Sequence, residues 1–209
     1  MRSLLIALAL ALTLLGTSVM AAEEPPFTIR LTSGEYAVRD YPPLVLAEVS
    51  VRGDRETAAG QGFRLLAGYI FGDNIRRQKI AMTAPVVRSP AGETIAMTKP
   101  VLQTGEDGAW IIRFIMPRGS VLETLPRPNN PKVQLHAVAA TRVAVVRFSG
   151  LARQDDVAAK TLALSKFIGA QHLQAIGSPS LAQYDPPWTP WFMRRNEMMI
   201  AVAPAAGLK

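Results

Sequence analysis

The predicted strands and helices of this chain follow a pattern that occurs twice, and this repeat limits the folds that the chain can adopt. In each half, strands precede a helix and further strands follow it. The two halves share this order of elements, but little sequence identity. For example, Val49–Val51 precedes the first helix, and Arg147–Ser149 precedes the second. Two such halves predict an α+β domain in which two helices pack on a curved, largely antiparallel sheet.

The first half is predicted to contain a strand pair and an amphipathic helix. Tyr36–Arg39 and Leu44–Val51 are expected to pair on either side of Pro42-Pro43. Asp54 is the predicted N-cap of a helix over residues 55–71. The apolar residues of this helix recur at helical spacing: Ala59, Phe63, Leu66 and Ile70.

An eight-residue motif then occurs twice. Residues 80–87 read IAMTAPVV, and residues 95–102 read IAMTKPVL around a turn cluster at Ser89–Gly92. The two copies predict a hairpin whose prolines lie at an edge or a bulge. Trp110–Met116 alternates between two apolar faces and predicts a further strand.

The second half is predicted to contain four strands and one helix. The helix is capped by Asp155 or Asp156 and ends at Ile168. The strands are Val133–Ala139, Arg142–Phe148, Ser180–Tyr184 and Trp191–Val202. Because each half alone has too few elements to bury a core, residues 23–209 are expected to form a single domain.

Residues 1–22 have the layout of a secretory signal peptide. Arg2 supplies the positive charge, Leu4–Leu15 is an apolar run, and small residues lead to a cleavage site after Ala21 or Ala22. A membrane anchor is the alternative, but the run is shorter than the roughly 20 residues of a membrane span. We therefore expect a periplasmic or secreted protein with no stable membrane span after cleavage.

Composition excludes several kinds of site. The chain has no cysteine and only two histidines, which excludes disulfides, thiolate metal sites and a three-histidine zinc site. The formal net charge is +7. The arginines of the chain are spread along it, whereas a nucleic-acid-binding protein usually clusters its positive charge among aromatic residues. The charge therefore indicates a solvated basic surface, and no nucleic-acid partner is expected.

No catalytic motif is present, and Glu197 is the most unusual charged residue. It lies in an otherwise apolar strand, where a carboxylate is a buried acid, a receptor for a cationic ligand or the partner of an arginine. An ion pair with Arg194 or Arg195 is the favoured interpretation. Glu197 and Tyr184 could also act as an acid–base pair in a hydrolase-like enzyme, although their spacing is not a recognised signature.

The histidines and methionines offer weak candidates for iron ligation. His136 is predicted to point to solvent from its strand, and His172 to lie just after the second helix. Methionine is a soft ligand and adapts to flat molecules, but core filling is its commoner role. The methionines on predicted strands are Met82, Met97, Met116, Met193, Met198 and Met199. No metal-binding residue is assigned.

Several motifs resemble the SOUL haem-binding family in the family's order. They span Tyr36 to Val202 and include FRLLAGYIFGDN, KIAMTAPV, IMP, VAVVRFSG and YDPPWTP followed by RRNE. The resemblance implies duplicated βαββ-like halves that form a distorted, largely antiparallel β-barrel flanked by two helices. It also implies similarity to the effector-binding domains of multidrug-sensing regulators.

The resemblance further implies non-enzymatic binding of haem or a related tetrapyrrole in an apolar cleft, with no catalytic residue. Some family members are described as holding the ligand against the first helix, with basic side chains near the propionates. The residues expected to bind the cofactor here are Phe63, Arg64, Leu66, Ile70, Arg76, Lys79 and Met82. A general receptor for flat hydrophobic molecules, with haem incidental, is the alternative function. The oligomeric state is left open.

Overall fold

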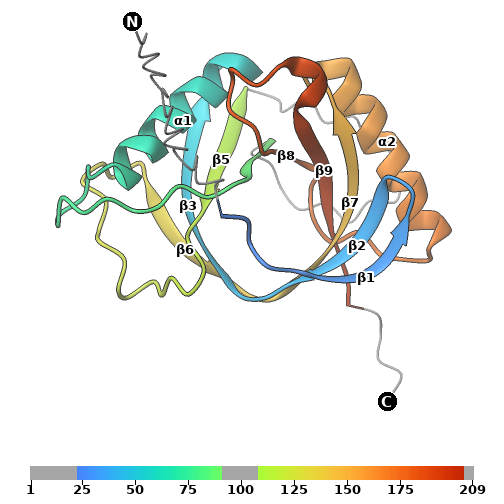
Figure 1. The fold of residues 1–209 in the computed structure, drawn as a ribbon, viewed down its shortest axis with the longest axis horizontal. Helices are drawn as coiled ribbons and strands as arrows, with labels where there is room; N and C mark the ends of the chain where they lie inside the picture. The colour runs from blue at the N-terminus through green and yellow to red at the C-terminus, as the bar shows by residue number, and fades with distance from the viewer. Residues whose placement is uncertain (1–22, 91–107, 205–209) are drawn as a thin grey trace, which may run out of the picture.

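The computed structural model describes residues 23–90 and 108–204, whose nine strands form one antiparallel sheet flanked by two helices (Figure 1). The elements are β1 (Thr28–Ser33), β2 (Tyr36–Tyr41), β3 (Leu44–Arg52), α1 (Arg55–Ile70), β4 (Val86–Pro90), β5 (Ala109–Ile115), β6 (Gln134–Val138), β7 (Thr141–Ser149), α2 (Gln154–Ala170), β8 (Ser180–Gln183), a 3₁₀ turn (Trp191–Met193) and β9 (Arg195–Val202). Their order in the sheet is β1-β2-β7-β9-β8-β4-β5-β3-β6. The predicted α+β class with two helices is confirmed, but β1 and β6 end the sheet, so "barrel" describes it only approximately.

The duplication is visible in the topology. In the first half, β5 lies between β3 and β4, and in the second half β9 lies between β7 and β8. Each half is thus a βαββ unit, and the halves join where β4 pairs with β8. The helices α1 and α2 lie on the outer side of the curved sheet (Figure 1). The inner side is therefore left to the loops and the N-terminal segment.

Each half also donates a strand to the other half. The predicted strand β2 pairs with β7 rather than with β3, and β6 pairs with β3 rather than with β7. The expected pairing of 36–39 with 44–51 is therefore wrong. The reason lies in the cores: Val38 of β2 packs in the cluster under α2, whereas Val49 of β3 packs in the cluster under α1.

The helix ends follow local capping chemistry. The side chain of Asp54 accepts hydrogen bonds from the backbone N–H groups of Glu56 and Thr57, which confirms it as the α1 N-cap. The second helix starts earlier than predicted, with Arg153 at its N-cap. Asp156 lies in the first turn instead, and its carboxylate accepts the Arg153 N–H at 3.0 Å.

Other segments differ from the sequence prediction in extent. Residues 80–85 do not form a strand, and β4 begins only at Val86. The second copy of the eight-residue motif lies outside the described residues. The last strand begins at Arg195 because residues 191–193 form a 3₁₀ turn, and β1 has no counterpart in the prediction. Among the described residues, no helix is both long and apolar enough to cross a membrane.

Candidate functional site

The residues predicted to bind the cofactor fall into a buried and an accessible group. Leu66 and Ile70 are 0% and 1% exposed, because they face the sheet in the core beneath α1. Phe63 is 39% exposed and its ring meets the ring of Phe114 edge-on, 5.4 Å between centroids. Met82 is also partly exposed. The helix therefore offers a ligand Phe63 rather than the whole predicted apolar stripe.

The basic residues of the predicted set are all accessible. Arg64, Arg76 and Lys79 are exposed, and Arg76 donates a hydrogen bond to the carbonyl of Thr124 at 3.3 Å. They could reach the carboxylates of a ligand lying on the α1 surface. The predicted set stays a prediction, with Phe63, Met82 and these three cations as its accessible part.

The histidines lie on the surface, away from any cluster of ligands. The His136 side chain is 45% exposed and its Nε2 lies 3.9 Å from Glu48 Oε1, which confirms that it points outward. His172 is exposed directly after α2. No group of three metal-ligating side chains occurs in residues 23–90 and 108–204.

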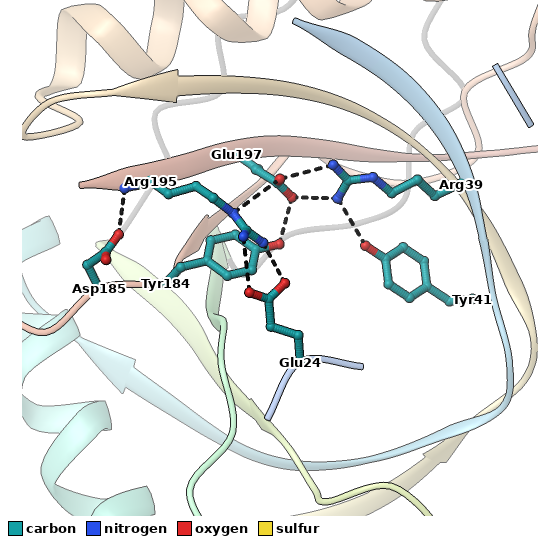
Figure 2. Close-up of polar contacts among 7 residues, drawn as sticks. All are labelled: Glu24, Arg39, Tyr41, Tyr184, Asp185, Arg195 and Glu197. Carbon is teal, nitrogen blue, oxygen red and sulfur yellow. Dashed lines mark hydrogen bonds and ion pairs between the residues drawn. The ribbon is translucent and has the colours of Figure 1, made fainter. Parts of the chain in front are cut away.

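A buried polar cluster lies on the inner side of the sheet, with Glu197 at its centre (Figure 2). Glu197 is 1% exposed. Arg39 binds it with two hydrogen bonds, from Nη1 to Oε2 at 2.8 Å and from Nη2 to Oε1 at 3.0 Å. Successive side chains of a strand point to opposite faces of a sheet. Val38, next to Arg39, and Met198, next to Glu197, face the core under α2, so Arg39 and Glu197 face the inner side.

Two further side chains complete the environment of Glu197. The Tyr184 hydroxyl donates to Oε2 at 2.6 Å, and Arg195 Nε lies 3.6 Å from Oε1. The guanidinium of Arg195 stacks on the Tyr184 ring, 3.5 Å from its centroid. Burial, together with the negative charge of Glu197, raises the pKa of Tyr184 well above its ordinary value. Its hydroxyl therefore remains a donor to Glu197.

Arg39 has two aromatic neighbours as well as its carboxylate. Its Nη1 lies 3.4 Å from the hydroxyl of Tyr41, and its guanidinium stacks on the ring of Phe27 at 4.4 Å. Burial alone would lower the pKa of Arg39, but the hydrogen bonds and charge of Glu197 outweigh it and raise the pKa overall. Arg39 is thus a permanent cation held by Glu197.

The sequence singled out Glu197 correctly but not its principal partner. Arg194 does not contact Glu197, because it donates to the carbonyls of Pro187 and Thr189. Arg195 is a partner, at the longer distance given above. Arg39 is the closest charged partner, and the sequence of β2 shows it as one of two adjacent charges, Arg39 and Asp40.

A small cavity and an exposed aromatic loop on the described surface bear on ligand binding. The cavity, of about 210 Å³, is lined by Glu48, Ser50, Lys132 and Gln134. It is polar and smaller than the roughly 300–1,000 Å³ of most small-molecule sites. The loop between β8 and β9 exposes four large apolar side chains by 61–83%: Trp188, Trp191, Phe192 and Met193.

A comparison with protein families gives one match. The model of the family described as "SOUL heme-binding protein" matches residues 22–201, which is most of the chain. No curated protein matches the chain.

Solved structures with a similar fold are distant in sequence. The C-terminal domain of EcmrR superposes with a TM-score of 0.58 at 10% identity, covering 80% of this chain and 96% of that one. A hydrolase from Listeria innocua gives a TM-score of 0.53 at 8% identity, covering 83% and 94%. An uncharacterized conserved protein from Listeria innocua gives 0.53 at 10% identity, covering 88% and 94%. These likenesses confirm the effector-binding-like fold and carry no function.

Proposed function

Because this chain belongs to the SOUL haem-binding family, we propose that it binds haem or a related tetrapyrrole outside the cytoplasm without catalysing a reaction. The family match over residues 22–201 is the observation that carries this proposal. The exposure of the predicted residues supports it, since Phe63 and Met82 are accessible for apolar contact and the three cations are accessible for the propionates. The macrocycle would lie on the α1 surface, with its propionates toward Arg64, Arg76 and Lys79.

The environment of Glu197 favours a non-enzymatic role. The carboxylate oxygens already accept two hydrogen bonds from Arg39 and one from Tyr184, and the group is buried. A general base needs an oxygen that can reach the proton of a substrate. The Glu197–Tyr184 pair is therefore a structural contact in this proposal, not an acid–base pair.

Packing rather than histidine ligation is expected to hold the macrocycle. Burying on the order of 300 Å² of apolar surface at about 25 cal/mol per Å² gives about 7–8 kcal/mol before the cost of association. That cost reduces the affinity to about the micromolar range. Each exposed cation adds at most about 1 kcal/mol through a propionate.

We expect the double variant His136→Ala/His172→Ala to lower the affinity for hemin by less than about tenfold, because both histidines are exposed and isolated. Phe63→Asp should weaken binding more, since it replaces the accessible aromatic ring of α1 with a charge. Leu162→Asp is the matched control, an equal change at an exposed residue of α2. The measurement is an absorbance titration of the mature protein with hemin.

Two outcomes would contradict this proposal. If the double histidine variant loses the bound-haem absorbance band while Phe63→Asp keeps it, then iron ligation holds the ligand. If the unmodified protein shows no saturable binding, the haem assignment fails, and the general receptor for flat hydrophobic molecules replaces it.

Export rests on the predicted signal peptide at residues 1–22. Protein purified from its native host is expected to begin near Ala22 or Glu23, with a formal charge of 22 − 16 = +6 after Arg2 is removed. N-terminal sequencing measures this directly. A cytoplasmic protein that retains Met1 would show that the segment is not a signal peptide.

A further inference from the structure

The N-terminal segment Glu23–Phe27, here called the strap, passes over the buried Glu197 cluster. Figure 1 shows it in dark blue, leading into β1. Its first residue forms a parallel bridge with Thr83, and the Glu23 carbonyl accepts the N–H of Ala84 at 2.9 Å. The strap therefore extends from the segment before β4, past β9, to the beginning of β1.

Two strap side chains dock on the arginines of the cluster. The Glu24 carboxylate accepts two hydrogen bonds from Arg195, at 2.6 Å from Nη2 and 3.0 Å from Nη1 (Figure 2). The Phe27 ring lies over the guanidinium of Arg39 and 5.4 Å from the ring of Tyr41. The strap thus places one carboxylate and one aromatic ring against two fixed guanidinium groups.

The two arginines that the strap contacts, Arg39 and Arg195, are each fixed by another side chain of the cluster. Arg39 is fixed by Glu197, and Arg195 by its stacking on Tyr184. A guanidinium held in this way suits the two-point binding of a carboxylate and the stacking of a flat ring. The donors of Arg195 that face the strap are its two Nη groups, which bind Glu24, whereas its Nε is buried and lies 3.6 Å from Glu197 Oε1.

We propose that the inner side of the sheet is a binding site for a planar aromatic carboxylate and that the strap occupies it as an internal substitute for this ligand. The ligand's carboxylate takes the place of Glu24 on Arg195, and its ring takes the place of Phe27 over Arg39 and Tyr41. Without Glu24, the two arginines face only Glu197, and the excess positive charge favours an anion. This site is separate from the α1 surface proposed for haem.

The contacts of the strap are of the kind that a ligand can replace. Glu24 and Phe27 are about 40% and 36% exposed. Ion pairs of such exposure shift an equilibrium by about fivefold at most. A ligand must first displace the strap, so its apparent affinity is reduced by the fraction of molecules in which the strap is open.

A disulfide lock tests whether the strap covers the site. The chain has no cysteine, so Glu23→Cys/Thr83→Cys introduces a single possible pair at two bridged positions. A disulfide requires a Cα–Cα separation of about 4.4–6.8 Å, and bridged residues of neighbouring strands meet this requirement. The probe is 1-pyrenecarboxylate, followed by fluorescence anisotropy. The oxidised protein should bind it at least about tenfold more weakly than the same protein reduced with a phosphine.

Point variants test the two contacts separately. Glu24→Gln removes the competing carboxylate and should tighten binding of 1-pyrenecarboxylate about two- to fivefold. Glu35→Gln is the matched control, since Glu35 is an exposed glutamate paired with Lys160 of α2 at 2.8 Å, and it should change nothing. The neutral probe 1-pyrenemethanol should bind the unmodified protein at least about fivefold more weakly than the carboxylate.

Each result decides the proposal. Weaker binding in the oxidised lock, tighter binding in Glu24→Gln and preference for the carboxylate together support it. Equal binding by the oxidised and reduced forms would show that the strap covers no ligand site. Equal binding of the neutral and anionic probes would show that Arg195 does not receive a carboxylate, and an absence of saturable binding in the reduced lock would also overturn the proposal.

Discussion

Replacing Glu197 with alanine is expected to lower the free energy of unfolding by about 3–5 kcal/mol, because it leaves the Arg39 cation buried without a counter-charge. The Arg39 side chain is 11% exposed and Glu197 is 1% exposed, so bulk water solvates the Arg39 charge poorly once the carboxylate is lost. Tyr184 loses its hydrogen-bond acceptor in the same variant. Urea denaturation of the mature protein, monitored by tryptophan fluorescence, measures the change.

Two further variants identify the cause of this loss. Arg39→Met/Glu197→Met replaces both charges by apolar groups and should cost much less than the sum of the single changes. Glu35→Gln breaks an exposed ion pair and should cost less than about 1 kcal/mol. If the double variant is as unstable as the two single variants added together, the pair is not energetically coupled and our explanation is wrong.

Gly62→Ala is expected to cost about 1–3 kcal/mol or more, because α1 packs on the sheet with its backbone against Ile112. A Cβ atom at Gly62 would lie 2.4 Å from Ile112 Cγ1 and 2.8 Å from Ile112 Cβ. Neither neighbouring atom is the free end of a flexible side chain, so the helix itself must move away from the sheet. Thermal and urea denaturation measure the loss of stability.

The same helix provides the control. A Cβ atom at Gly60 would have only Arg64 Nη1 nearby, at 3.9 Å. Alanine is a better helix former than glycine, so Gly60→Ala should stabilise the protein by about 0.5–1 kcal/mol. Opposite signs for the two changes would show that contact with the sheet, not helix propensity, decides the result at Gly62. Equal stability of both variants would refute the close packing.

Most of the helices and strands are predictable from the sequence, apart from β1, residues 80–85 and the 3₁₀ turn at 191–193, whereas the pairing of the strands is not. Alternation identifies which residues of Leu44–Arg52 share a face, and helical spacing identifies α1. Neither pattern names a partner strand. The partners of β2 and β6 belong to the opposite half and depend on which helix each strand covers. Proximity in the sequence therefore does not identify partners, since β2 pairs with β7 and β3 pairs with β6.

The inner cluster was predictable only in part for a related reason. Glu197 stands out as a charge in an apolar strand, and the same reasoning applied to Tyr36–Tyr41 points to Arg39 and Asp40 alike, of which only Arg39 belongs to the cluster. Their contact joins positions 158 residues apart, which no local pattern encodes. No sequence pattern marks the strap, which contains Pro25 and Pro26 and has no periodicity. Of the predicted cofactor residues, Leu66 and Ile70 share the helical spacing that marks the core-facing stripe of α1, which is why they are buried.

The exchange of strands between the halves has a consequence for how the chain folds as it is synthesised. Tyr36 of β2 pairs with Val146 of β7, about 110 positions later in the sequence. Likewise, β3 can pair with β6 only after β6 has been synthesised. Such distant pairing gives a high contact order, which slows folding. The N-terminal half cannot complete its sheet until the ribosome has made β6 and β7. We expect slow folding of this kind to favour transport of the unfolded polypeptide across a membrane, which suits the proposed export.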